Sequence, residues 1–308
     1  DFGFNLHDQS TYYNANRTSK PATISYLAPA YNYEKEVNDV RENAMKLIGY
    51  MNGILQKYVP GQVGRYNDDF EPRAFGDNIQ KWGTSVVLIE SGGYPNDPEK
   101  QFIRKLNFVT ILSAIRAIAT KEYEKSSKEE YFKIPENDRK LFDLKLIGVQ
   151  YELLGNTYTV DLGIDSREVS AHTESGYYYK AGVSDMGDLS TYYGYKEFDA
   201  SAYAVVAPKV YPETFSTINA VVEKGVSSFL KEGFAYVKVE HLPEDKDAIN
   251  IPLHVISDKK NTAVNLYVGA NPTFFLKKND SLEYLIINGN LVDLKKPEQD
   301  FSNALIYK

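Results

Sequence analysis

The chain has 308 residues, of which 43% are hydrophobic and 25% are charged, a composition typical of a folded protein of one or two domains. Its formal net charge of −7 argues against nucleic acid or an anionic membrane surface as the main partner. The sequence contains no cysteine, which excludes disulfides, thiolate metal sites and cysteine nucleophiles, and it contains no apolar stretch long enough to span a bilayer.

Strands and helices are predicted to alternate through the first third of the chain. Short β-like runs occupy residues 2–6 and 22–28, and residues 85–89 form a continuous apolar run typical of a strand buried on both faces. A helix is expected from about Tyr33 to Leu55, because apolar residues recur there at helical spacing. A second long helix is expected after Asp97-Pro98-Glu99, since proline and an acidic residue suit a first helical turn. This alternation predicts an α/β layered sheet.

The composition changes after about residue 125. Residues 125–139 are polar and indicate a linker or crossover, and a single helix is expected over residues 212–230. Short β-like runs dominate the remainder, at residues 145–153, 158–164, 203–206, 235–239, 251–256, 263–268 and 284–287. We therefore expect two domains: an α/β domain at residues 1–124 and a β-rich (α+β) domain with one helix at residues 135–308.

Two polar residues stand where predicted strands end. His7 follows the run at residues 2–6, and Glu90 follows the run at residues 85–89. Active-site residues of open α/β sheets gather at such strand ends. A lone histidine is usually structural or exposed, and a carboxylate at the end of a buried strand is either a satisfied structural ion or a site group.

These stretches resemble the latter half of the zinc carboxypeptidase (carboxypeptidase A-like) family. The resemblance rests on Asn5-Leu6-His7-Asp8-Gln9, on the helix that follows, and on Val86 to Gly93, and it extends through Gly64 to Phe70 and Pro72 to Asp77. It covers about residues 1–122 and looks closest to large exported bacterial members. The resemblance implies the C-terminal portion of an α/β domain with a mixed central sheet, a zinc cofactor, a peptide or protein substrate, and an exported protein.

The resemblance also implies roles for particular residues. His7 would be the downstream zinc-binding histidine, and Glu90 would take the proton of zinc-bound water and return it to the leaving amine. Asp8 is either a partner that orients His7 or the cap of a loop. Tyr66 matches the substrate-contacting tyrosine of the family at an inexact offset, and Arg73 either contacts a substrate carboxylate or forms a surface ion pair.

The other half of the family's zinc site is not found in this chain. The H-x-x-E motif and the arginines that grip the substrate carboxylate belong upstream of His7, where six residues precede it. The H-x-x-E at His241 to Glu244 lies between β-like runs and is interpreted as a chance match, and His172 has no partner at metal-ligand spacing. The chain begins inside a predicted strand, so we expect upstream sequence to exist and the chain alone to be inactive.

Two functions remain open at this point. The first is zinc-dependent peptide hydrolysis of the metallocarboxypeptidase type, with this chain as a downstream fragment. The alternative is a non-catalytic, degenerate peptidase that binds peptide or glycan. Residues 135–308 contain no motif with a mechanism, and we expect an accessory module there. Its tyrosines either line a ligand groove or form a hydrated β surface, as at residues 177–179, 192, 193 and 195.

Overall fold

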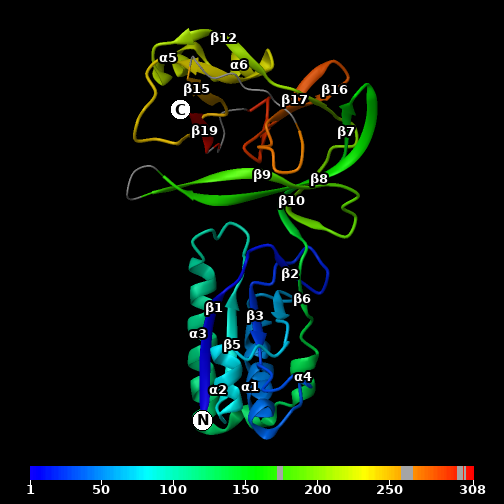
Figure 1. The fold of residues 1–308 in the computed structure, drawn as a ribbon, viewed down its shortest axis with the longest axis vertical. Helices are drawn as coiled ribbons and strands as arrows, with labels where there is room; N and C mark the ends of the chain where they lie inside the picture. The colour runs from blue at the N-terminus through cyan, green and yellow to red at the C-terminus, as the bar shows by residue number, and fades with distance from the viewer. Residues whose placement is uncertain (172–175, 258–265, 297–300, 302) are drawn as a thin grey trace. The chain divides into compact units, whose positions relative to one another are not determined.

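The computed structural model describes residues 1–171, 176–257, 266–296, 301 and 303–308, which form two compact units (Figure 1). Unit 1 comprises residues 1–141 and 191–193, and unit 2 comprises residues 142–190 and 194–308. Unit 1 is an α/β unit and unit 2 is β-rich, so the expected combination of classes is confirmed. His172 and residues 263–265 of a predicted strand lie outside the described residues, and residues 266–268 form no strand.

Unit 1 is built on a mixed four-stranded sheet with the strand order β1-β5-β3-β4. β1 (Phe2–Asp8) is parallel to β5 (Ser85–Ser91), β5 is antiparallel to β3 (Ile24–Leu27), and β3 is parallel to β4 (Val63–Arg65). A short antiparallel pair joins β2 (Tyr13–Ala15) to β6 (Asn137–Arg139). The helices of the unit are α1 (Asp39–Leu55), α2 (Phe75–Lys81), α3 (Gln101–Thr120), the 3-10 helix η1 (Glu122–Lys125) and α4 (Lys128–Phe132).

One face of this sheet forms the core of unit 1. Alternate strand residues point to the same face, and on this face they are apolar. Ile24 and Tyr26 of β3 are fully buried, as are Val87 and Ile89 of β5, and they pack in one cluster with residues of α1 and α3. The opposite face carries the alternate residues, which include His7 and Glu90.

The polar segment expected as a linker or crossover folds within unit 1. Residues 128–132 form α4, and residues 137–139 form β6. Tyr131 of α4 is fully buried, and its hydroxyl accepts a hydrogen bond from the Ala28 backbone N–H at 3.3 Å. One buried tyrosine therefore anchors a stretch whose other residues are mostly polar.

The described residues of unit 2 form two sheets. One has the order β18-β17-β16-β11-β7-β8-β9, with β10 also paired to β7, and the other has the order β12-β13-β15-β19-β14. The strands of the first sheet are β7 (Leu141–Leu153), β8 (Asn156–Ser170), β9 (Tyr177–Gly187), β10 (Tyr193–Asp199), β11 (Ala204–Val206), β16 (Phe274–Lys278), β17 (Ser281–Ile287) and β18 (Asn290–Asp293). The strands of the second are β12 (Lys209–Phe215), β13 (Phe234–Val239), β14 (Ala248–Ile249), β15 (His254–Ser257) and β19 (Ala304–Tyr307).

The prediction of a single helix over residues 212–230 is wrong both in where the helix starts and in its continuity. Pro212 lies inside strand β12, and the helical part is divided into α5 (Ile218–Lys224) and α6 (Val226–Lys231). Gly225 separates them with φ 95° and ψ 104°, a conformation outside the helical region that glycine adopts without steric cost. The apolar spacing was helical, but glycine interrupts the hydrogen-bond ladder.

No helix among the described residues is both long enough and apolar enough to cross a membrane.

Candidate functional site

His7 and Glu90 are direct neighbours across the β1–β5 pair. The parallel register places His7 opposite Glu90, one residue before each strand ends. Parallel strands present their carboxyl ends at the same sheet edge, and residues opposite one another direct their side chains to the same face. Two residues that are 83 positions apart in the sequence are thereby brought together on the sheet face opposite α1 and α3.

The next strand adds a hydroxyl to this row. Ser25 of β3 lies opposite Glu90 in the antiparallel β3–β5 register. Its Oγ accepts hydrogen bonds from Gln9 Nε2 at 3.0 Å and from Asn137 Nδ2 at 3.1 Å. Asn137 Nδ2 also donates to Gln9 Oε1 at 3.0 Å. A hydrogen-bonded amide and hydroxyl network therefore borders the carboxylate on its β3 side.

The environments of the two central residues differ. Glu90 is only 6% exposed, whereas His7 is exposed to solvent. Burial raises the pKa of Glu90 above its ordinary value, and the negative charge of Asp8 raises it further. The positive charges of His7 and Lys100 lower the pKa, but their effect is smaller than that of burial. Glu90 therefore holds a proton at a higher pH than an ordinary glutamate, beside an accessible imidazole.

Gly92 makes the turn after Glu90 possible. A Cβ atom at this position would lie 2.0 Å from the Ala22 carbonyl oxygen and 2.8 Å from Gln9 Nε2. The Gly92 N–H donates to the Thr23 carbonyl at 3.0 Å, which ties the turn to the segment before β3. The glycine is thus required by close backbone approach, and it keeps Gln9 against the end of β5.

Asp8 forms an ion pair with a residue that the sequence did not indicate, and its two expected roles remain predictions. Its side chain is 72% exposed and forms an ion pair with Lys100. Because strand residues alternate in direction, Asp8 points to the face opposite that of His7. The Lys100 ammonium also donates to the carbonyls of Ser91 at 3.0 Å and Gln9 at 3.4 Å, so it joins the ends of β1 and β5.

Tyr66 lies near the pair, and Arg73 does not contact it. Partial burial raises the pKa of Tyr66, and the neighbouring Tyr13 and the charge of Glu90 add to this effect. Arg73 is 91% exposed and its Nε pairs with Glu71 Oε1 at 3.2 Å. Of the two interpretations of Arg73, the surface ion pair is present in the structure. The substrate roles of Tyr66 and Arg73 remain predictions.

Sequence reasoning missed Lys100, Ser25, Gln9 and Asn137. Ser25 carried a weak signal, because it is a polar residue inside the apolar run of β3. Lys100 carried none, because its role depends on a left-handed backbone (φ 52°) just before α3. Asn137 lies in the segment that was expected to be a linker.

The two histidines of unit 2 that the structure describes, His241 and His254, belong to no cluster of metal-ligating side chains among the described residues. His241 is exposed in a turn, and within the described ranges no three His, Asp or Glu side chains are grouped to hold a metal. His254 is fully buried: its Nδ1 accepts from the Leu305 N–H at 2.9 Å, and its Nε2 lies 2.9 Å from Thr273 Oγ1. Burial lowers the pKa of His254 to about 3, so it is a neutral structural residue.

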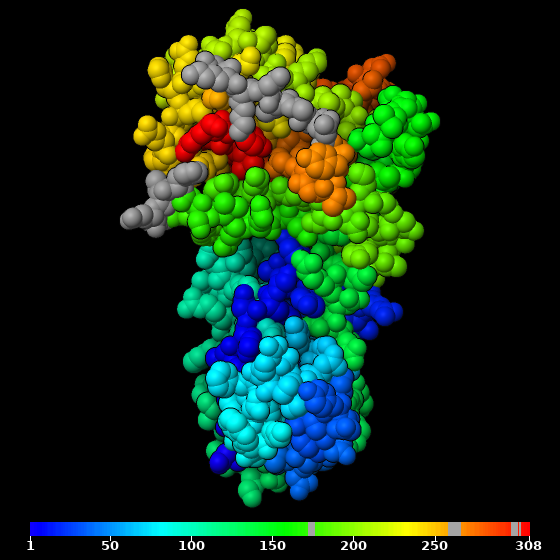
Figure 2. Space-filling model, in the orientation of Figure 1, coloured from blue at the N-terminus to red at the C-terminus, as the bar shows by residue number. Residues whose placement is uncertain are grey.

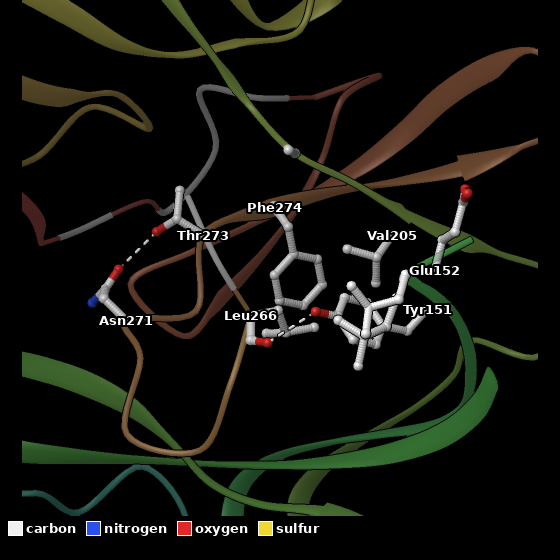
Figure 3. Close-up of a pocket in the computed structure, with 10 residues that line it drawn as sticks. Tyr151, Glu152, Val205, Leu266, Asn271, Thr273 and Phe274 are labelled. Atoms are coloured by element: carbon white, nitrogen blue, oxygen red, sulfur yellow. Dashed lines mark hydrogen bonds between the residues drawn. The ribbon is translucent and has the colours of Figure 1, made fainter. Parts of the chain in front are cut away.

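A cavity of about 280 Å³ in unit 2 is lined by other residues (Figure 3). Its walls include Leu153, Val205, Leu266 and Phe274. Two hydrogen bonds join residues of its wall: the Tyr151 hydroxyl donates to the Leu266 carbonyl at 3.1 Å, and Thr273 Oγ1 donates to Asn271 Oδ1 at 2.7 Å. The cavity has a mixed polar and apolar lining and contains none of the predicted site residues.

Comparisons with known proteins do not show a family. No protein-family profile matches the chain, and no curated protein matches it. One solved structure is similar over 32% of this chain and 19% of that chain, with 17% identity and a TM-score of 0.24: the N-acyl-D-glutamate deacylase from Bordetella bronchiseptica, complexed with zinc and a phosphonate inhibitor. A likeness at this level carries no argument about fold or function.

The raised pKa of Glu90 predicts a stability change that depends on pH. Between the ordinary glutamate value of 4.5 and the folded value, the native state keeps a proton that the unfolded chain releases, so stability falls as pH rises through this range. The Glu90→Gln variant has no carboxylate at this position to titrate, so it does not lose this stability. The gain in the free energy of unfolding is about 1.4 kcal/mol for each unit by which burial raises the pKa of Glu90. We expect the variant to be more stable than wild type at pH 7 and to lose this advantage near pH 4.

Urea unfolding across that pH range, followed by circular dichroism and by the fluorescence of Trp82 in unit 1, would measure the difference. Glu34→Gln is the matched control, because Glu34 is an exposed glutamate of the same unit. A Glu90→Gln advantage that is the same at pH 4 and pH 7 would contradict the assigned environment of Glu90.

Proposed function

We propose that unit 1 carries part of a metallocarboxypeptidase-type centre, with His7 as a zinc ligand and Glu90 as the group that takes up and returns a proton. The observation that supports this proposal is the register of β1 and β5, which sets an exposed imidazole beside a buried carboxylate at one sheet edge. The mixed sheet and the strand-end position of both residues agree with the resemblance seen in the sequence.

The residues described in this chain fit only part of a zinc site. A catalytic zinc has three protein ligands and an open position for water. His7 and Glu90 are one imidazole and one carboxylate, and no group of three metal-ligating side chains occurs in the described part of the chain. In the family, moreover, the glutamate acts on the water and is not itself a ligand. Further ligands must therefore come from residues other than those described.

The chain's own residues have separate tasks in this proposal. The pKa of Glu90 is raised by burial, which makes its carboxylate a better proton acceptor near neutral pH than an exposed glutamate. The ring of His7 is accessible and available to bind a metal. Lys100 fixes the ends of the two strands through the Ser91 and Gln9 carbonyls. Zinc, when bound, would supply a polarised water and a charge that stabilises the developing oxyanion.

A second function, a degenerate peptidase that binds peptide or glycan without cleaving it, is favoured by one observation. The described residues place a single histidine at the site. A domain that has lost the remaining ligands would keep the same strand-end pair. Hydrolysis distinguishes the two functions, because the binding protein would retain its ligand without turnover.

Zinc titration of the 308-residue chain tests the metal assignment. We expect weak binding near one equivalent. The free energy of binding should be far below the roughly 10–16 kcal/mol of a structural zinc site, because His7 is the one ligand assigned in this chain. His7→Ala should abolish this binding, whereas His241→Ala should leave it unchanged. Calorimetry with Zn²⁺ would measure both. Equal zinc binding by wild type and His7→Ala would remove His7 from the proposal.

A further inference from the structure

Strand β7 of unit 2 loses its partner on one side before it ends. One side of β7 pairs with β8 as far as Leu153. On the other side β10 lies against an earlier part of β7, because backbone hydrogen bonds next to its two ends reach Lys140 and Ile147. β11 follows with a single register pair, Ala204 opposite Gln150. Beyond that pair, none of the described strands pairs with this side of β7.

Backbone groups of β7 and β11 face each other where this pairing ends. The Gln150 N–H donates to the Tyr203 carbonyl at 2.9 Å. Successive residues of a strand direct their backbone groups to alternate sides, so the Glu152 N–H points to the β11 side and the Val205 carbonyl to the β7 side. A hydrogen bond between these two groups would add a second register pair, and the β7–β11 ladder has one pair. Neither group therefore has a strand partner within the described ranges.

The cavity of about 280 Å³ lies between the diverging ends of these strands (Figure 3). Residues 151–154, at the end of β7, line it together with Val205 and Ala207, and the rest of its wall includes Leu266 and the buried ring of Phe274. In Figure 2 the green turn between β7 and β8 and the orange segment before β16 lie next to each other at the surface of unit 2. Unpaired backbone groups therefore border this cavity on two sides, and an aromatic ring forms part of its inner wall.

An extended peptide has the chemistry that complements these walls. Its backbone presents an N–H and a C=O to each side at the two-residue repeat of a strand, which is what the facing edges of β7 and β11 lack. In strand addition such main-chain hydrogen bonds supply affinity, and pockets for alternate side chains supply specificity. One side chain of the peptide would meet Phe274 and Leu266, where an aromatic or branched aliphatic group buries the most apolar surface.

We propose that unit 2 binds an extended peptide, which inserts as a strand between the diverging ends of β7 and β11 and places an apolar side chain against Phe274. The Glu152 N–H donates to the peptide on one side, and the Val205 carbonyl accepts from it on the other. The residues that carry this inference lie in unit 2, whereas His7 and Glu90 lie in unit 1. Failure of the zinc assignment would therefore leave this inference unchanged.

Amide hydrogen exchange in the nitrogen-15-labelled 308-residue chain tests the proposal with blocked pentapeptides. The probes are acetyl-Thr-Val-X-Val-Thr-amide, with phenylalanine, leucine or aspartate as X, and the phenylalanine peptide with both valine nitrogens methylated. We expect the phenylalanine and leucine peptides to slow exchange of the Glu152 amide by about tenfold or more, because this N–H becomes hydrogen-bonded. The Gln150 amide, which already donates to Tyr203, is the internal reference. Aspartate at X and backbone methylation should each weaken binding by about tenfold or more.

A pair of variants at one position separates the backbone donor from the side chain. Glu152→Pro removes the N–H that has no partner among the described residues, and should lower the affinity for the phenylalanine peptide by about tenfold. Glu152→Gln keeps the N–H and should bind the peptide as wild type does. Circular dichroism would show whether both variants fold, and the comparison of peptides on the wild-type chain does not depend on either variant.

Four results would overturn the proposal. The first is slow exchange of the Glu152 amide in the free chain, which would show that the chain's own residues close the gap. The second is slow exchange of this amide, without peptide, in a protein extended upstream of Asp1, which would assign the gap to the upstream residues. The third is equal binding of the phenylalanine peptide and its aspartate or methylated counterpart, which would exclude strand insertion. The fourth is no binding of any peptide at millimolar concentration.

Discussion

Glu90→Gln is expected to lower peptide hydrolysis by about 10²- to 10⁴-fold in a protein that contains this chain together with the remaining zinc ligands. The amide keeps the shape of the side chain but cannot take up the proton that the proposed reaction requires. The same variant is expected to be more stable than wild type at neutral pH, since it removes a buried carboxylate. Loss of activity with a gain in stability separates a catalytic role from simple unfolding.

Release of the C-terminal residue from a peptide with a free carboxylate, measured with and without added zinc, gives the rate. Glu34→Gln, at an exposed glutamate of the same unit, should have the rate of wild type. Normal hydrolysis by Glu90→Gln would show that Glu90 does not take part in the reaction. If the wild-type protein with all zinc ligands does not hydrolyse the peptide, the non-catalytic binding function is favoured instead.

Arg41→Met is expected to cost unit 1 about 3 kcal/mol of stability, because it breaks a buried ion pair from one side. Arg41 is 1% exposed, and its Nη2 lies 2.7 Å from Asp68 Oδ2. Its Nε donates to the Ala28 carbonyl at 3.1 Å and its Nη1 to the Lys35 carbonyl at 2.7 Å. Methionine fills the space but leaves the carboxylate and both carbonyls without this donor.

Lys46→Met on the same helix is the control. Lys46 pairs with Glu42 at 2.8 Å one turn away, at a partly exposed position, and such pairs contribute about 0.3–0.5 kcal/mol. Urea unfolding followed by Trp82 fluorescence would compare the two variants. If Arg41→Met loses no more stability than Lys46→Met, the buried arginine does not organise the start of α1 and the loop around Asp68.

The parts of unit 1 that could be predicted are those with a strong local pattern. The apolar run before Glu90 predicted a buried strand, and the spacing of apolar residues predicted α1 and α3. Strand ends then marked His7 and Glu90 as site candidates. The register that makes them neighbours could not be predicted, because it depends on pairing between segments separated by most of unit 1.

Other features depended on a single residue or on a distant contact. Gly225 divides the helix expected over residues 212–230, although the apolar spacing continues on both sides. The pairing of Asp8 with Lys100 depends on a left-handed residue before α3, which no local pattern indicated. Tyr131 brings a polar segment into the core by burying one aromatic ring.

The most direct test of the central claim is a zinc titration of the 308-residue chain followed by nitrogen-15 imidazole and carbon-13 carboxylate NMR. The chain has four histidines, so each imidazole can be assigned by a single substitution. We predict that zinc shifts the imidazole signals of His7 and, with the same dependence on zinc, the carboxylate signal of Glu90. An unchanged His7, or zinc-dependent shifts at His241 and Glu244 instead, would contradict the assignment of the β1–β5 strand ends as the functional site.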